Sequence, residues 1–224
     1  MKKRIMCLTK YKTWTPFVDL FGGIQKLQRV TDIEKNDVVL FEGGTDISSY
    51  LYKEPQSLYS GKPDTCRDMI EMLMFRQAHK VGATMLGICR GSQFLTAMNG
   101  GTVIQHCHGH TQWHNIQTYN KKVIWVSSTH HQMMNPFNLK HKEYEILGWA
   151  APSRSDVYLN GYLDNLLEIM TVEPEIVWYP KTRSLAIQGH PEYMRPNSYL
   201  YDGTLDQSDP FVEYSRKLIK EYLL

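Results

Sequence analysis

Long apolar segments, a strong excess of one charge and paired cysteine motifs are all missing from this sequence. The formal net charge of +2 gives no electrostatic reason to expect nucleic acid or an anionic membrane as a partner. No segment approaches the length of a membrane-spanning helix, and the apolar run after the basic N-terminus is too short for a signal peptide. The sequence therefore predicts a protein that binds neither nucleic acid nor membrane.

The four cysteines, Cys7, Cys66, Cys89 and Cys107, have no CxxC spacing. Without a secretory segment they are expected to be reduced thiols, which indicates a cytoplasmic location. Internal repeats, low-complexity tracts and interdomain linkers are also absent. Because 42% of the 224 residues are hydrophobic and 21% are charged, we expect one globular domain over residues 1–224.

Segments with strand and helix patterns alternate along the chain. Short apolar runs predict buried strands at 4–8, 37–41, 85–88, 123–126, 175–179 and 184–188, and antiparallel strands at 144–149 and 166–172. The spacing of apolar residues predicts helices at 19–30, 64–80, 92–98 and 210–222. This alternation predicts an α/β fold with three layers and a mostly parallel central sheet.

A cysteine stands between two glycines where a predicted strand meets a predicted helix, at Gly87, Cys89 and Gly91. Gly-x-Cys-x-Gly is the thiol form of a nucleophile elbow, a sharp strand-to-helix turn that exposes one reactive side chain. The start of the following helix supplies partial positive charge and unpaired backbone N–H groups, which favour a thiolate and a developing oxyanion. A lone cysteine here would be interpreted as a buried structural residue, so its assignment depends on its partners.

Two other predicted strand ends supply the groups that a cysteine nucleophile needs. His190 is a candidate base at the end of one strand, and Glu192 can orient its imidazole ring. Gly43 and Gly44 end another strand, and their backbone N–H groups, with that of Arg90, would form an oxyanion hole. Because ligands of α/β folds bind at the carboxyl ends of parallel strands, these groups are expected to meet there.

These motifs resemble the class I glutamine amidotransferase superfamily, and within it the γ-glutamyl hydrolase-like branch that includes γ-glutamyl-γ-aminobutyrate hydrolases. The likeness spans roughly residues 38–193, and its motifs occur in the same order. Besides the elbow and Gly189–Glu192, it includes Gly43–Asp46 with Tyr50, Arg67 and Asp68 with Glu71, Asn99–Thr102 with Gln105, and Ser128 with His130–Gln132. The resemblance implies a flavodoxin-like, class I glutamine amidotransferase-like fold.

Carried over to this chain, the resemblance implies Cys89 as the nucleophile, His190 as the base and later the acid, and Glu192 as the residue that orients it. The backbone N–H groups of Gly44 and Arg90 would bind the oxyanion. The reaction would proceed through a γ-glutamyl thioester, and it would require no metal ion and no organic cofactor.

The resemblance also implies which residues hold the substrate. Gly43, Gln93, Ser128, Thr129 and His130 would bind the amino-acid end of a γ-glutamyl group. The side on which the amine leaves is less defined. A glycine precedes the histidine where the branch has a bulky aromatic residue, and an aspartate-glycine turn typical of the branch cannot be placed. The amine that is released therefore stays open.

Two other groups of residues have alternative interpretations. The loop at 106–114 contains four histidines and a cysteine, which are usual zinc ligands, but their spacing matches no closed zinc site. We therefore predict no metal site. Arg67, Asp68 and Glu71 are either a solvated helix face or a structural ion-pair group near the glycine pair, and the sequence leaves both open.

Three functions are consistent with these motifs. The first is a glutaminase of the amidotransferase type, which acts on glutamine and passes ammonia to a separate partner synthetase, since no synthetase domain is found in the sequence. The second is a stand-alone hydrolase of γ-glutamyl amines or peptides. The third is a catalytically silent binding protein, which the complete set of Cys89, His190 and Glu192 argues against. The oligomeric state is not predicted.

Overall fold

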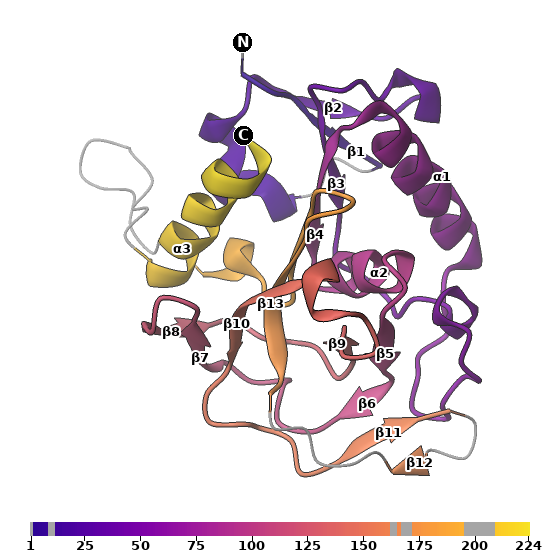
Figure 1. Ribbon diagram of the computed structural model, residues 1–224, viewed down its shortest axis with the longest axis vertical. Coiled ribbons are helices and arrows are strands. Elements are labelled where there is room, and N and C mark those ends of the chain that lie inside the picture. Colours follow the sequence, from indigo (N-terminus) through magenta and orange to yellow (C-terminus); the bar gives the residue numbers. More distant parts are fainter. Residues whose placement is uncertain (1, 9–11, 162–164, 167–171, 195–208) are drawn as a thin grey trace.

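A nine-stranded sheet forms the centre of the computed structural model, which describes residues 2–8, 12–161, 165–166, 172–194 and 209–224 (Figure 1). In spatial order its strands are β2 (Ile24–Lys26), β1 (Ile5–Cys7), β3 (Val38–Phe41), β4 (Thr84–Ile88), β14 (Ser184–Ile187), β13 (Pro174–Tyr179), β10 (Glu145–Ala150), β7 (His114–Thr118) and β8 (Val123–Val126). Neighbouring strands from β2 to β14 pair in parallel. From β14 to β8 the pairing is antiparallel.

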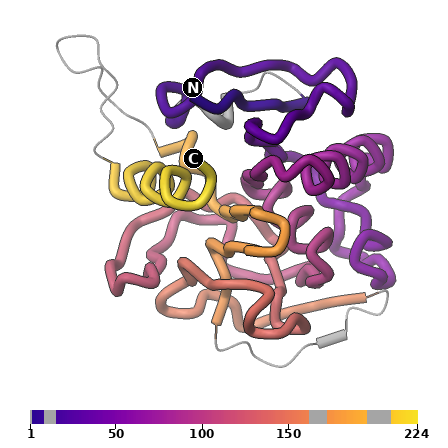
Figure 2. Tube along the Cα trace, turned by 45° about the horizontal axis from the view of Figure 1, so that its top comes forward, coloured from indigo at the N-terminus to yellow at the C-terminus, as the bar shows by residue number. Residues whose placement is uncertain are grey.

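Helices cover both faces of this sheet. They are α1 (Thr65–Val81), α2 (Arg90–Met98) and α3 (Pro210–Leu218), which continues as a π-helical turn at Ile219–Leu223. In Figures 1 and 2, α1 and α2 lie on one side of the parallel strands and α3 lies on the other. The structure confirms the predicted three-layer α/β fold with mostly parallel core strands.

Alternation along the parallel strands divides the core in two. Ile5 and Cys7 of β1 belong to the hydrophobic cluster that contains Phe211 of α3. Met6, between them, belongs to the cluster that contains Met74 of α1. Successive side chains of a strand point to opposite faces, so a wholly apolar strand contributes to both layers. This explains why the parallel strands could be recognised as continuous apolar runs.

Shorter elements connect these layers. Two small sheets contain β6 (His106–Cys107), β11 (Tyr158–Asn160) and β12 (Asn165–Leu166), and β5 (Thr102–Ile104) with β9 (Met133–Asn135). Short 3₁₀ helices occur at Lys12–Leu20, Val30–Asp32, Ser49–Tyr52, His141–Glu143 and Pro191–Tyr193. No helix in the described ranges is long and apolar enough to cross a membrane. All four cysteines lie in these ranges, and none of them forms a disulfide.

The helix predicted at 19–30 is wrong. In its place, β2 extends the sheet beyond β1. Gly22 and Gly23 interrupt the helical spacing, and the backbone bonds to β1 instead: Ile5 N–H donates to the carbonyl of Gly23 at 2.9 Å. Because β2 is an edge strand with little buried surface, its pairing depends on a neighbour that local sequence does not reveal.

The helix predicted at 64–80 is confirmed as α1. Asp64 caps it, since its carboxylate accepts the backbone N–H of Arg67 at 3.0 Å. Of its apolar residues, Met74 is buried but Leu73 is 52% exposed. Polar residues of the same helix are buried instead, because α1 supplies charged groups to the elbow.

Most strand predictions agree with the structure to within one or two residues. The strand predicted at 166–172 can be compared only in part, because residues 167–171 lie outside the described part of the chain. β7 and β11 were not predicted. Burial alternates over only five residues in β7, and β11 is three residues long with no alternation, so both strands are recognisable only through their partners.

The first turn of α2 packs directly on the end of β3. Gly91 has an ordinary backbone conformation, yet a Cβ atom there would overlap the carbonyl oxygen of Phe41. A Cβ atom at Gly87 would overlap the carbonyl oxygen of Gly91. Both glycines of the elbow are therefore required by close packing between backbone segments, and not by unusual backbone angles.

We expect Gly91→Ala to lower the free energy of unfolding by about 1–3 kcal/mol or more, because backbone atoms must move to accommodate the new methyl group. Gly61→Ala is the matched control, since its Cβ atom would meet only the carboxylate end of Asp46, at 3.3 Å. The control should change stability by less than about 0.5 kcal/mol. Urea unfolding measures both, and equal stabilities of the two variants would contradict this packing argument.

Candidate active site

The turn between β4 and α2 holds Cys89 in a backbone conformation that residues other than glycine rarely adopt. Its φ is 51° and its ψ is −110°, immediately after Ile88 ends β4 and before Arg90 begins α2. Such strain persists only where the surrounding structure enforces it, and it is concentrated at functional sites. The local geometry is that of the elbow predicted from the sequence, with α2 starting two residues earlier than expected.

His190 and Glu192 lie beside this elbow. β14 pairs in parallel with β4, with Ile187 opposite Ile88, so the residues that follow the two strands emerge at the same edge. His190 Nδ1 is 2.7 Å from Glu192 Oε1, which leaves the other ring nitrogen for the hydrogen bond to Cys89. The side chains of His190 and Glu192 are each only 6% exposed. The structure thus brings together the three residues predicted to form the catalytic group.

The charge state of His190 follows from these contacts. Burial lowers the pKa of its imidazole, but hydrogen bonds to Cys89 and Glu192 and their negative charges outweigh burial and raise the pKa to about 10. The ring is therefore an imidazolium at neutral pH. This cation lies next to Cys89, where it can donate a proton to a leaving group.

The loop after β3 passes against the same group. A Cβ atom at Gly43 would be 3.1 Å from Cε1 of His190 and 3.7 Å from Cβ of Cys89. Gly44 has a φ of 148°, and a Cβ atom there would be 2.5 Å from Nη1 of Arg67. The absence of a side chain at Gly43 therefore lets its backbone approach Cys89 and His190, and at Gly44 it leaves room for the guanidinium of Arg67.

A buried group of charges supports the elbow from behind. The guanidinium of Arg90, 1% exposed, donates to the carboxylates of Asp68 and Glu71 in α1. Asp68 and Glu71 are themselves 0% and 1% exposed. Of the two interpretations left open by the sequence, the solvated helix face is wrong and the structural ion-pair group is confirmed.

Arg67 connects this group to the glycine loop. Its Nε atom donates to Glu71 at 2.8 Å, while Nη2 and Nη1 donate to the backbone carbonyls of Glu42 at 2.7 Å and Gly43 at 3.0 Å. With both carbonyls held on the α1 side, the orientation of the following peptide units is fixed. The oxyanion loop and the elbow are therefore positioned by the same charge network.

The backbone of His190 is held by a residue that the sequence did not single out. Ser127, after β8, donates its hydroxyl to the carbonyl of His190, and its own carbonyl accepts the backbone N–H of His190 at 3.3 Å. A Cβ atom at Gly189 would be 2.8 Å from the carbonyl oxygen of Ser127 and 3.0 Å from Cζ of Phe211. Phe211 in α3 thus occupies the space where an aromatic side chain at position 189 would lie.

Tyr193 is a second residue that sequence reasoning missed. Its ring stacks on the imidazole of His190, with the ring centroids 4.2 Å apart and the planes inclined by 8°. Tyr193 is 48% exposed, so one face of it covers His190 and the rest faces solvent. An aromatic residue three positions after a candidate catalytic histidine is the signal that could have indicated this contact.

The residues predicted to hold the substrate are differently placed. Gln93 is buried, and its Nε2 donates to the backbone carbonyl of Gln132 at 3.0 Å. The hydroxyl of Ser128 donates to a neighbouring backbone carbonyl, and His130 Nδ1 donates to the carbonyl of Gln132 at 2.8 Å. The side chains of Ser128 and His130 are therefore engaged within the protein, and Thr129 and the backbone stay available to a ligand.

With this geometry established, comparison with known proteins identifies the family. The model of the family described as Peptidase C26 matches residues 24–151, more than half of the chain and including Cys89. The chain belongs to this family. The resemblance to the class I glutamine amidotransferase superfamily is confirmed by this match and by the relatives and structures that follow.

Several relatives of this peptidase C26 member are named for glutamine amidotransferases. A YvdE homologue of Lactococcus lactis subsp. cremoris, named a glutamine amidotransferase-like protein, is 31% identical over 99 residues, which are 40% of this chain and 53% of that protein. Protein NtpR of Enterococcus hirae is 22% identical over 185 residues, 78% of this chain and 74% of that protein. The chain spans about half the length of the Lactococcus relatives it matches, 53% and 42%.

Solved structures share the fold across almost the whole chain. A glutamine amidotransferase from Thermotoga maritima superposes with a TM-score of 0.57 at 14% identity, covering 100% of this chain and 95% of its own. A protein from Thermoplasma acidophilum that is named for a GMP synthase gives a TM-score of 0.56 at 14% identity, covering 99% and 98%. At this identity the likeness establishes the fold alone.

We expect the Glu192→Gln variant of this C26 protein to lower the pKa of His190 from about 10 by at least one unit, because the variant removes the carboxylate that favours the imidazolium. NMR titration of the His190 ring, assigned with His190→Gln, measures the change. Since the folded-state pKa lies above the ordinary 6.5, the stabilisation from this group is complete below pH 6.5 and is lost as the pH rises through about 10. Identical midpoints in both proteins would contradict the proposed role of Glu192 in holding the charge.

Proposed function

We propose that this protein is a cysteine hydrolase that cleaves a γ-glutamyl amide bond, with glutamine as the substrate and a separate synthetase as the acceptor of the ammonia. The observation that carries the proposal is Cys89 on a strained elbow next to His190, whose Nδ1 lies 2.7 Å from Glu192 Oε1. The family membership and the amidotransferase-like relatives support the same chemical class.

In the proposed reaction, the thiolate of Cys89 attacks the γ-carbonyl carbon of the substrate. The carbon–nitrogen bond breaks, and the departing ammonia or amine takes a proton from the imidazolium of His190. A water molecule then attacks the thioester carbon and gives a proton back to His190, which releases glutamate and the thiolate. Glu192 keeps Nδ1 of the ring occupied, so the other nitrogen faces the reacting atoms.

The negative charge that develops on the carbonyl oxygen is assigned to backbone donors. We assign it to the N–H groups of Gly44, in the loop after β3, and of Arg90, in the first turn of α2. The N–H groups of a helix's first turn have no partner within the helix and are available to an anion. One such donor contributes on the order of 10²–10³-fold in rate in related acyl-transfer chemistry.

The amino-acid end of the substrate is assigned to Gly43, Gln93 and the segment Ser128–His130. Gly43 lies against both His190 and Cys89, which makes its backbone the nearest part of this set to the reacting bond. Because the side chains of Ser128 and His130 are engaged within the protein, we assign the direct contact in this segment to Thr129 and to backbone groups.

A stand-alone γ-glutamyl hydrolase is the second candidate. The description of the matching family as a peptidase favours hydrolysis of a γ-glutamyl amine or peptide without a partner. The first candidate is favoured by the relatives named for amidotransferases and by a structure of the same fold that is named for a synthase. The two differ in the leaving group and in the need for a partner, and both use the same cysteine.

We expect Cys89→Ala to abolish glutamate release from glutamine or γ-glutamyl amines, with kcat reduced by at least about 10³-fold, because no other group can form the thioester. Cys66→Ala is the matched control, since Cys66 is an exposed thiol at the start of α1. Glutamate is measured enzymatically, and an electrophilic glutamine analogue should label Cys89 but not Cys66. Unchanged release by Cys89→Ala would exclude the mechanism, and the absence of both labelling and release would favour a silent binding protein.

The leaving group is tested by comparing substrates in the absence of any other protein. As the glutaminase of an amidotransferase, the isolated chain should turn over glutamine slowly and γ-glutamyl amines no faster. Its glutamine turnover should rise when a partner synthetase is added. A stand-alone hydrolase should instead prefer one γ-glutamyl amine by at least about tenfold in kcat/KM and gain nothing from a partner. The pattern of kcat/KM values decides between the two candidates.

A further inference from the structure

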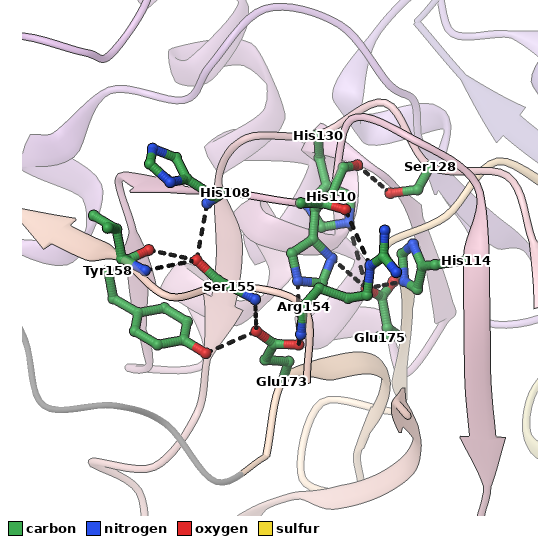
Figure 3. Close-up of polar contacts among 12 residues, drawn as sticks. His108, His110, His114, Ser128, His130, Arg154, Ser155, Tyr158, Glu173 and Glu175 are labelled. Carbon is green, nitrogen blue, oxygen red and sulfur yellow. Dashed lines mark hydrogen bonds and ion pairs between the residues drawn. The ribbon is translucent and has the colours of Figure 1, made fainter. Parts of the chain in front are cut away.

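Five buried titratable residues form a second group of polar side chains that the proposed reaction does not use. They come from three segments: His110 before β7 and His114 at its first residue, His130 after β8, and Glu173 and Glu175 at the start of β13 (Figure 3). Their exposed fractions are between 0% and 3%. We call these five residues the His–Glu cluster.

The two carboxylates of the cluster are in different environments. Glu173 is fully satisfied, because it accepts the backbone N–H groups of Arg154 at 2.6 Å and Ser155 at 2.8 Å and the hydroxyl of Tyr158 at 2.7 Å. Glu175 has a buried Oε2 atom with no hydrogen-bond partner. An ionised carboxylate that is fully buried must be compensated by positive charge.

Imidazole nitrogens converge on the other oxygen of Glu175. His110 Nδ1, His114 Nε2 and His130 Nε2 lie 3.0, 3.1 and 3.5 Å from Glu175 Oε1 (Figure 3). Glu175 is therefore a buried carboxylate whose Oε1 atom is surrounded by three imidazole rings.

The orientation of His130 directs its Nε2 atom at the carboxylate of Glu175. Its Nδ1 must carry a proton, because it lies 2.8 Å from the backbone carbonyl of Gln132, which can only accept. In the neutral ring Nε2 is then unprotonated, and this buried atom makes no hydrogen bond. A ring whose Nδ1–H is held by a carbonyl and whose Nε2 is bare has the arrangement of a metal-binding histidine.

The two ring nitrogens of His110 lie within ion-pair distance of Glu175 and Glu173, but neither contact has the geometry of a hydrogen bond. Nδ1 lies 3.0 Å from Glu175 Oε1 and Nε2 lies 3.3 Å from Glu173 Oε2, yet neither nitrogen makes a hydrogen bond. Ligand atoms that share a tetrahedral ion with bonds of 2.0–2.1 Å lie about 3.3 Å apart, and each points at the ion and not at the other. Glu173 Oε2 lies beside the second nitrogen, where a ligating histidine usually has a carboxylate partner, and in this structure the two atoms form an ion-pair contact without a hydrogen bond.

We propose that His110, His130 and Glu175 bind one divalent transition-metal ion of the zinc class. Their ligand atoms all lie within 4.8 Å of one another. Two imidazoles and a carboxylate are donors that suit zinc, and a divalent charge compensates the two buried carboxylates of the cluster. The fourth position is left to His114 after a small rotation or to a water molecule.

The sequence analysis predicted no metal site, so this proposal differs from it. Only His110 comes from the histidine-rich loop at 106–114, and the other two ligands come from segments far along the chain. The ion would tie these segments together next to Ser127, which holds the backbone of His190. Its role is therefore structural, in the wall behind the proposed active site.

The test uses the full chain, purified without a metal-binding tag, stripped with a chelator and titrated with Zn²⁺ and Co²⁺. We expect one tightly bound ion per chain by elemental analysis and, with Co²⁺, the visible absorption bands of a low-coordinate site. His110→Ala and Glu175→Gln should each weaken binding by at least about tenfold. Zn²⁺ should also raise the thermal midpoint of the stripped wild-type protein by about 5 °C or more, a readout that needs no variant.

Two controls separate this site from other sources of binding. His108→Ala removes a 54% exposed imidazole from the same loop and should leave stoichiometry and affinity unchanged. Cys89→Ala should also retain the ion, so metal binding is assessed independently of the proposed hydrolysis. The proposal is overturned if the stripped wild-type protein binds no ion and gains no thermal stability. In that case His110 carries a second proton, and its positive charge compensates the carboxylates. Burial lowers the pKa of this ring, but Glu173 and Glu175 outweigh burial and raise it to about 9. Binding lost in His108→Ala but kept in His110→Ala and Glu175→Gln overturns it equally.

Discussion

The buried guanidinium of Arg90 is the constraint on which the geometry of the elbow depends. It joins the first residue of α2 to Asp68 and Glu71 of α1, and Glu71 in turn holds Arg67 against the carbonyls of the glycine loop. Removing one partner of such a buried pair leaves an uncompensated charge and costs about 3–5 kcal/mol. Two helices and two strand ends are therefore fixed to one another by a single charge network, at the side of the sheet away from α3.

This rigidity explains how a strained residue can be kept where chemistry is proposed. A positive φ at a non-glycine residue costs about 1–3 kcal/mol, which the surrounding contacts must offset. At Cys89 they include glycines that let α2 lie directly on β3, and the hydrogen bonds of Ser127 to the backbone of His190. The backbone on both sides of the reacting groups is thus held in place, and Glu192 occupies only one of the two ring nitrogens of His190, which leaves the other for the reaction that we propose.

Much of this arrangement could be predicted from the sequence, because its signals are local. Apolar runs that end in glycines marked β3 and β4, and the spacing of Cys89, His190 and Glu192 indicated three strand ends. What failed was decided by tertiary contacts. The residues of β2 look helical in isolation, and their strand conformation exists only because β1 offers an open edge.

The polar contacts beyond the elbow had even less local signal. Glu175 has the appearance of an ordinary strand residue, and nothing in the sequence around it indicates that three histidines surround it.

The order of strands in the sheet also determines when, during synthesis of the chain, the proposed active site can form. β14 lies between β4 and β13, so the strand that carries Cys89 keeps an unpaired edge until residues 184–187 have been synthesised. Cys89 is therefore synthesised long before His190, and the proposed hydrolysis becomes possible only after β14 has paired with β4.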